Sequence, residues 1–417
     1  MYKRSMYVIL LITLFSFINA EVSYEWGGFV RLDNFFDTRQ GVGTIDGSCY
    51  LYPKKANCDD QCCDINSRGK LGLTPSVSRF HFKTSGAKWG DAKISSYLEC
   101  DFKGCSPETI GLPHLRCFFF NIDWPKKSIT FGQTDHPFVP QKCYPHTIGD
   151  HGGEPIAPYA RYPQIKVDYH PTSLAFIGAI YCNFLYGNDG PIGQSLTYMQ
   201  NSMTPALNCA VEWRREKTFI GASFNLERIL PSLSTTTTST NVTTRTYASD
   251  DTLLSYLGSV YGSLELDNFL VQSQIVAGQN GYGLTLIGGY AVSCLNATTG
   301  KRTYTNTNAI SQWIDITYQK DQKMMPGLFI GIAQSLGSRN CVYRDSNCDP
   351  IFYGLDAELD RLVRVAPRIR SKFNNIELGF EFDYSKAWFG KMDCKGKHPK
   401  TYAVTNTRAL VVIMYYF

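Results

Sequence analysis

The sequence predicts an all-β protein, a transmembrane antiparallel up-and-down β-barrel of about sixteen strands. Three observations predict this fold. Apolar and polar residues alternate along many short segments, the connections alternate between short and long, and the chain ends on such a segment at Phe417. Strands with one face on lipid and the other on a wet lumen have this pattern. The composition agrees, since aromatic residues make up 14% of the chain and no segment after residue 20 is apolar enough for a helical span.

The first twenty residues predict an export signal. Lys3 and Arg4 form a charged start, residues 8–17 are apolar, and residues 18–20 resemble a cleavage site. The apolar run is too short to span a bilayer, so we expect removal of residues 1–20. The net charge of +5 then falls to +3 with the loss of Lys3 and Arg4. This small charge does not predict a nucleic-acid partner.

Alternation defines the two faces of each expected strand. Near the C-terminus, Ile376, Leu378, Phe380, Phe382 and Tyr384 oppose Glu377, Glu381 and Asp383. A soluble β-sandwich would alternate as well, so three further features favour a membrane: charges along whole polar faces, asymmetric connections and the terminal strand. We expect the main domain at 21–417, with long extracellular loops at 38–77, 135–163, 229–251, 281–307 and 338–360.

An even strand number is expected, because both ends of such a barrel lie on the periplasmic side. A first count gives seventeen, with residues 283–292 as the extra strand; placing this segment in the 281–307 loop leaves sixteen. The expected strands are 22–37, 78–87, 92–102, 114–124, 128–135, 163–171, 174–185, 207–216, 218–228, 252–265, 268–279, 309–320, 326–337, 361–373, 376–389 and 403–417. The 114–124 strand is the least clear, since it has no clean polar face.

The final strand places Ala409, Val411, Ile413, Tyr415 and Phe417 on one face. This resembles the C-terminal signal of Gram-negative outer-membrane barrels. The resemblance implies a place in the cell outer membrane, contact with its lipid, and recognition of Tyr415 and Phe417 by the barrel-assembly machinery. The alternative is an ordinary buried strand that ends a secreted domain.

A second resemblance covers most of the mature chain at the level of pattern. The blocks 78–82, 97–102, 115–116, 131–138 and 163–165 look like the early strands of trimeric porins. The resemblance implies a homotrimer that forms a water-filled channel for passive diffusion of small hydrophilic solutes. The chain departs from the porin pattern in its cysteine content and at Cys117, which puts the loops in doubt rather than the barrel.

We expect the 135–163 segment to fold inward and form the constriction, because a sixteen-stranded barrel is wide enough for a water channel. The alternative is an ordinary external loop. Facing strands of opposite charge would set up a transverse field across the lumen, or simply pair and stiffen the wall. The predicted pore-lining residues are Asp135, His136, His146, Asp150, Arg161, Arg364, Arg368, Arg370, Glu377, Glu381, Asp383, Arg79, Lys83, Glu99, Asp101, Arg31 and Asp33.

The chain has fourteen cysteines, which export would place where disulfides form. The disulfide candidates are Cys341, Cys348, Cys49, Cys58, Cys62 and Cys63, with Cys341–Cys348 the best single pair. A zinc site at Cys58, Cys62 and Cys63 is the alternative, although the spacing is poor and no His lies nearby. We predict no metal and no cofactor.

The scattered His residues give no spacing typical of a catalytic site, so we predict no enzyme. The stronger rival to a channel is a barrel that acts mainly as an adhesin or surface-structure protein through its extracellular loops.

Overall fold

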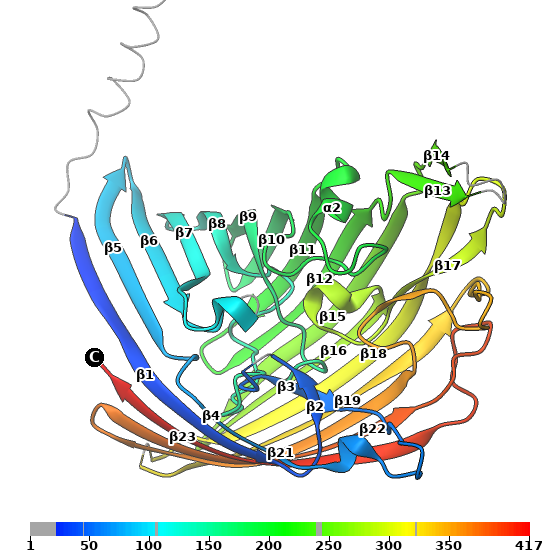
Figure 1. Cartoon of the computed structure of the whole chain (residues 1–417). Coiled ribbons are helices and arrows are strands. Elements are labelled where there is room, and N and C mark those ends of the chain that lie inside the picture. The colour runs from blue at the N-terminus through cyan, green and yellow to red at the C-terminus, as the bar shows by residue number, and fades with distance from the viewer. Residues whose placement is uncertain (1–21, 45, 105–106, 239–243, 322) are drawn as a thin grey trace, which may run out of the picture.

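The computed structural model of the protein describes residues 22–44, 46–104, 107–238, 244–321 and 323–417. The expected export signal at residues 1–20 therefore lies outside the described residues. Sixteen antiparallel strands form a closed barrel, and Figure 1 shows them as one curved wall with coil segments inside it. The wall strands are β1 (Ser23–Asp37), β5 (Arg79–Trp89), β6 (Ala92–Asp101), β7 (His114–Trp124), β8 (Lys127–Asp135), β9 (Arg161–Tyr169), β10 (Leu174–Tyr181), β11 (Ala206–Arg214), β12 (Thr218–Ile229), β15 (Leu253–Leu266), β16 (Phe269–Gln279), β18 (Arg302–Tyr318), β19 (Met325–Ser338), β21 (Leu359–Phe373), β22 (Ile376–Phe389) and β23 (Tyr402–Tyr416). The predicted fold class is confirmed, and each expected strand has its counterpart.

The barrel closes where β1 pairs with β23. Gly28 and Phe417 exchange both backbone hydrogen bonds there, each with a donor–acceptor distance of 3.2 Å. The seam requires a glycine, because a Cβ atom at Gly28 would lie 2.2 Å from the carbonyl oxygen of Arg79 on β5. Beyond this point the second half of β1 pairs with β4 (Lys70–Thr74), so the 38–77 segment contributes to the wall as well as to a loop.

Connections differ at the two ends of the barrel. At one end, two-residue turns join β15 to β16 and β21 to β22, with Asp267 and Asn374 in the left-handed region at φ values of 45° and 53°. Asp and Asn tolerate this conformation, and it matches the twist of hairpin strands. The opposite end carries the long connections, which include 136–160 and 339–358.

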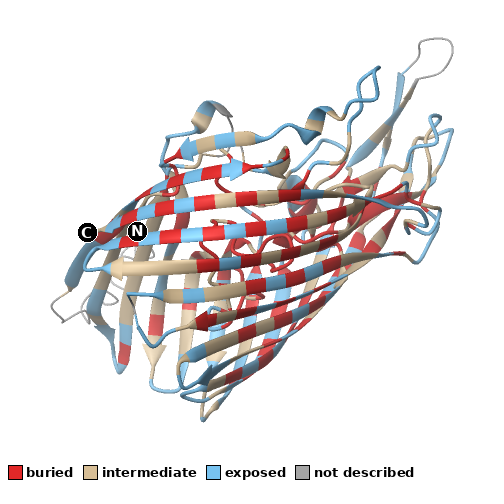
Figure 2. Cartoon of the chain, turned by 90° about the horizontal axis from the view of Figure 1, so that it is seen from below, coloured by how far each residue is buried: buried red, intermediate tan, exposed pale blue. Residues whose placement is uncertain are grey.

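Burial alternates along the wall strands, as the red and blue bands in Figure 2 show. On β22, Glu377, Glu381 and Asp383 are buried while Leu378 and Phe380 are exposed. The predicted faces are therefore correct: charges point inward and apolar side chains outward. Several exposed aromatic residues lie next to the short turns, where an interfacial belt is expected; among them are Trp89, Tyr169, Trp213, Phe269 and Phe373.

Within the described ranges, no helix has both the length and the apolar character to cross a membrane.

The remaining elements lie in the long connections. They are β2 (Gly41–Gly43), β3 (Tyr50–Pro53), η1 (Ile65–Ser67), η2 (Pro107–Thr109), α2 (Thr197–Asn201), β13 (Ser234–Thr238), β14 (Thr244–Ala248), η3 (Gly281–Leu284), β17 (Gly289–Leu295) and β20 (Phe352–Gly354). The segment 283–292 forms no wall strand. Its C-terminal part belongs to β17, which pairs with β20 and with the first residues of β18. Strand β18 begins at Arg302, seven residues before the predicted strand, because it extends past the wall to pair with β17.

A candidate pore along one wall of the barrel

The connection between β8 and β9 crosses the lumen and binds the opposite wall. The backbone N–H groups of Ile148 and Gly149 donate to the carboxylate of Glu381 on β22, at 2.7 and 3.1 Å. Farther along the wall, the thiol of Cys143 contacts backbone carbonyls of β15 and β16, both at 3.1 Å. Residues 136–160 are therefore an inward loop.

The inward loop covers the charged wall that the sequence predicts as pore lining. Arg364 is fully buried: its guanidinium pairs with Asp383 at 3.1 Å and donates to the carbonyl oxygens of Glu154 and Leu51. Arg368 pairs with Asp315 on β18 at 2.7 Å. These residues are closed off from solvent, so they do not line the lumen as the transverse-field interpretation expects. Arg364 pairs with Asp383 on β22, as the alternative interpretation expects, whereas Arg368 pairs with β18 instead.

Three adjoining cavities run through the interior beside the opposite wall, β5 to β9. The inner cavity lies toward the short turns and has a volume of about 570 Å³. The middle cavity is the smallest at about 250 Å³, and the outer cavity near the long connections has about 440 Å³. Arg116 lines all three, and Asp150 and Tyr159 line both the middle and the outer one. This row of cavities is the candidate pore.

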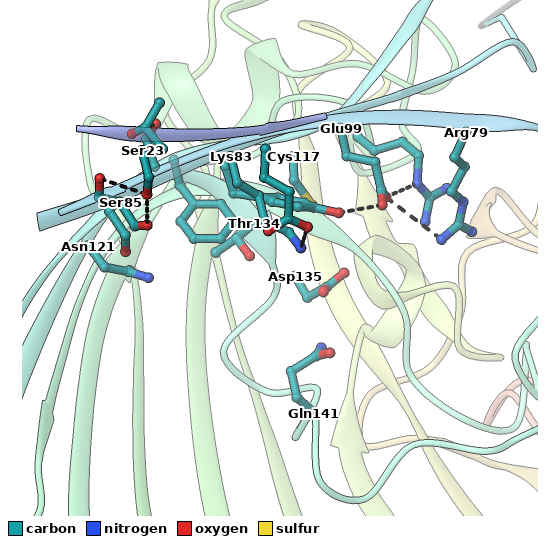
Figure 3. A pocket seen from close by; sticks show the side chains of 17 residues that line it. Ser23, Arg79, Lys83, Ser85, Glu99, Cys117, Asn121, Thr134, Asp135 and Gln141 are labelled. Carbon is teal, nitrogen blue, oxygen red and sulfur yellow. Dashed lines mark hydrogen bonds and ion pairs between the residues drawn. The ribbon is translucent and has the colours of Figure 1, made fainter. Parts of the chain in front are cut away.

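Paired charges surround the middle cavity. On β7, Arg116 donates to Glu99 at 2.6 Å and to Asp101 at 2.9 Å. Arg79 on β5 lies 3.4 Å from Asp150 in the inward loop, which also pairs with Lys103. Figure 3 shows Glu99 and Arg79 at one end of the inner cavity and Ser23 and Ser85 at the other, with Asp135 and Gln141 along one side. The smallest of the three cavities thus lies between basic side chains of the wall and an acidic side chain of the loop.

The surroundings of the inward loop shift the pKa values of its two acidic residues Asp150 and Glu154 in opposite directions. Burial opposes ionisation of Asp150, but Lys103 and Arg79 outweigh it and lower the pKa of Asp150 below its ordinary value. Burial raises the pKa of Glu154 to about 8. Asp150 therefore stays charged at neutral pH, whereas Glu154 is mostly protonated.

Arg161 extends into the outer cavity from the start of β9. It donates to the phenol oxygens of Tyr159 and of Tyr186, the latter at 3.3 Å. The guanidinium carbon lies 5.2 Å from the ring centroid of Tyr159, a distance typical of a cation–π contact. The outer cavity is therefore both basic and aromatic.

The predicted site residues divide by position. Those that line a cavity are Asp135, Asp150, Arg161, Arg79, Lys83, Glu99 and Arg31. Those that are buried in wall contacts or cores are His136, Arg364, Arg368, Glu377, Glu381, Asp383, Asp33 and Asp101. His146 and Arg370 are half-buried and joined to each other, because the Arg370 guanidinium donates to the His146 carbonyl at 3.1 Å.

Two of the corrections have local causes. His136 lies among aromatic rings of the wall, with the Tyr181 centroid at 4.3 Å, so it packs in a core rather than facing the pore. Asp33 pairs with Arg31 on its own strand at 2.5 Å, and Arg31 also donates to the Ile148 carbonyl, which anchors the inward loop.

Arg116 is the main residue absent from the predicted set, and a β-bulge explains why. Glu99 pairs with Cys117 and Cys100 pairs with Leu115, so Arg116 is an extra residue that opposes no partner. Arg116 and Cys117 consequently both point inward, and the alternation of β7 is lost. The sequence does carry a sign of this bulge, since the expected strand 114–124 has no clean polar face. Lys103, Gln141, Tyr144, Tyr159 and Tyr186 also line the cavities and lie in irregular segments without periodicity.

The described cysteines are free thiols in this structure. Cys49 is buried beside the outer cavity, and Cys58, Cys62 and Cys63 are exposed in a small turn. In the described part of the chain, no group of three or more His, Cys, Asp or Glu side chains is placed to hold a metal ion. The disulfides remain predictions.

No family model and no curated protein matches the sequence. Solved structures do match. The outer membrane channel DcaP of Acinetobacter baumannii is 16% identical, with 95% of this chain and 97% of that chain covered and a TM-score of 0.66. OmpT, an outer membrane protein of Vibrio cholerae, is 10% identical over 95% and 98% of the two chains with a TM-score of 0.55. The anion-selective porin from Comamonas acidovorans is 9% identical over 95% and 100% with a TM-score of 0.53.

The fold is that of a sixteen-stranded outer-membrane β-barrel of the porin type. At these identities the likeness establishes the fold, and function has to be argued from the interior of the barrel.

Proposed function

We propose that the protein is a porin in the outer membrane of a Gram-negative bacterium, a water-filled channel for passive diffusion of small hydrophilic solutes. The observation that carries this proposal is the row of three adjoining cavities that share Arg116. Such a row gives a polar solute a path along β5 to β9 between the short-turn end and the long-connection end. The short turns and the chain ends face the periplasm in this arrangement, and the long connections face outward.

In this proposal the inward loop narrows the path. It fills the side of the lumen next to β18, β21 and β22, where Ile156 and Ala157 pack against Trp313 and Phe329. The other side holds the three cavities, which are lined by charged groups. The loop thus sets the width of the channel, which is what limits solute size in a diffusion pore.

We infer a homotrimer, held by outward apolar faces in contact with each other and with lipid. One V. cholerae OmpT structure, 11% identical with a TM-score of 0.54, is a trimer form, which supports this assembly for a barrel of the same fold. Tyr415 and Phe417 point outward at the end of β23, where the barrel-assembly machinery would read them.

Single-channel recording in planar bilayers tests the proposal. The purified barrel should give stepwise ohmic conductance. A Gln141→Trp variant should lower this conductance, because Gln141 lines the inner and middle cavities. Lys142→Trp is the matched control, since Lys142 is the next residue, is equally exposed and lies outside the three linings. A folded barrel without conductance would contradict the proposal and favour the adhesin interpretation.

A further inference from the structure

Two long connections meet at the outer end of the barrel. One is 339–358, between β19 and β21, and the other is 390–401, between β22 and β23. Their backbones are hydrogen-bonded side by side: Ser338 N–H donates to the Lys395 carbonyl at 2.7 Å, and Val342 N–H donates to the Cys394 carbonyl at 2.8 Å. This pairing brings Cys341, the residue before Val342, next to Cys394.

Side chains hold the two connections in this register. The ammonium group of Lys395 donates to the Arg339 carbonyl at 3.0 Å, and the Arg344 guanidinium donates to the Met392 carbonyl. Val342 and Met392 are buried together in a small apolar cluster under the connections. The approach of the two cysteines is therefore fixed by polar contacts on one side and by apolar packing on the other.

Cys341 and Cys394 are both exposed free thiols. The neighbouring Cys341 thiol raises the pKa of Cys394. Cys348, the partner expected from sequence spacing, lies in a different setting. It occupies a tight turn with φ at 62°, where its N–H donates to the Asp345 carbonyl and its carbonyl accepts from Arg344.

We propose that Cys341 and Cys394 form a disulfide in the exported protein, in place of Cys341–Cys348. The oxidant is a protein disulfide of the periplasm. The thiolate of one cysteine attacks a sulfur of that disulfide and releases one oxidant thiol, and the second cysteine then displaces the other. One S–S bond forms in this chain, one breaks in the oxidant, and the two protons end on the oxidant's thiols.

The bond would clamp two connections across strands β21 and β22. These strands carry Arg364, Glu381 and Asp383, the groups that hold the inward loop. A covalent link between residues 341 and 394 lowers the conformational entropy of the unfolded chain. It also prevents the two connections from separating. The inference does not depend on conduction, because an adhesin with this fold would carry the same clamp.

Peptide mapping decides between the two pairings. The wild-type barrel is extracted from outer membranes in the presence of a thiol-alkylating reagent and digested with trypsin without reduction. We expect peptide 340–344 joined to peptide 392–395, since Arg339, Arg344, Lys391 and Lys395 flank them. Peptide 340–344 joined to 345–361 would reveal Cys341–Cys348 and overturn the proposal. Alkylated peptides 340–344 and 392–395 would overturn it as well.

Variants add a second measurement. Cys341→Ser and Cys394→Ser should each remove the joined peptide, whereas the matched control Cys348→Ser should keep it. A reductant should lower the melting temperature of the wild type and of Cys348→Ser. The same reductant should not lower the melting temperature of Cys341→Ser, because this variant lacks the bond. An equal decrease of the melting temperature in all three proteins would contradict the proposal.

Discussion

Glu381 on β22 accepts a hydrogen bond of 2.7 Å from the backbone N–H of Ile148, at the middle of the inward loop. A second bond, from Gly149, reaches the other carboxylate oxygen at 3.1 Å. Glu381 is thus an acceptor buried between wall and loop, and its two bonds fix how far the loop reaches across the lumen. In the proposed channel, the width of the path on the far side depends on this attachment.

Replacement of Glu381 by Ala should release the loop. Two buried N–H groups lose a charged acceptor, and hydrogen bonds of this kind contribute roughly 1.5–3 kcal/mol each. We expect a lower melting temperature together with larger and noisier single-channel conductance. Asp315→Asn is the control, because Asp315 pairs with Arg368 within the wall. This control should lower the melting temperature and keep the conductance of the wild type; unchanged conductance in Glu381→Ala would contradict the assigned role.

Ion selectivity should be weak with a slight preference for anions. The basic side chains that line the three cavities are Arg31, Arg79, Lys83, Lys103, Arg116 and Arg161, and the acidic ones are Glu25, Glu99, Asp135, Asp150 and Glu154. Protonation of Glu154 leaves a small positive excess at neutral pH. The reversal potential in a salt gradient measures this preference.

Two substitutions should shift the reversal potential in opposite directions. Arg79→Gln removes a positive charge from the inner and middle cavities and should move the channel toward cations. Asp135→Asn removes a negative charge from the same two cavities and should move it toward anions. Arg368→Gln, on the buried wall, should leave the reversal potential unchanged. Equal shifts of the reversal potential in Arg79→Gln and Arg368→Gln would show that ions do not pass along these three cavities.

Selectivity should also change with pH through Glu154. Its pKa is raised to about 8 by burial, with Lys103 opposing and Asp150 adding to the rise. Between pH 7 and pH 9 the group loses its proton, so the outer cavity gains a negative charge and the preference for anions should fall. Glu154→Gln should flatten this profile. A wild-type profile that is already flat would contradict the burial of a neutral carboxyl group.

The same group should affect stability. Because the folded pKa of about 8 lies above the ordinary value of 4.5, the folded protein binds more protons than the unfolded chain between these values, so this contribution to stability is fully present below pH 4.5 and is lost by the time the pH passes 8. The melting temperature of the wild type should therefore fall between pH 5 and pH 8. Glu154→Gln should show a smaller fall, measured by loss of the folded band on heating.

The sequence alone could locate the wall strands, because lipid on one face and water on the other impose alternation on each of them. Glu381 and Phe380 illustrate this: neighbours in sequence, they lie on opposite faces of β22. The even strand number then excluded 283–292 from the wall. These inferences depend on local pattern and on topology, and both are readable without a structure.

The position of the pore within the barrel was not readable in this way. It depends on which wall the inward loop contacts, and that follows from contacts between residues far apart in sequence, such as Gly149 with Glu381. Arg116 was missed because a bulge interrupts the period of β7, and a period of two is the signal on which strand prediction rests. Cys394, which we propose as the partner of Cys341, was not found from the sequence for a related reason, since spacing favours near neighbours.

Removal of Phe417 should impair closure of the barrel. The Gly28 N–H and carbonyl would lose both partners at the end of the seam, while the pairs from Phe29–Tyr416 to Asp37–Arg408 would remain. We expect a smaller fraction of protein in the folded, heat-modifiable form and less protein in the outer membrane. Tyr402→Ala is the control, because Tyr402 is an exposed aromatic residue at the other end of β23. Equal losses in the two variants would show that β23 needs aromatic side chains in general, whereas a loss confined to the Phe417 deletion would assign assembly to the terminal residue and its two bonds with Gly28.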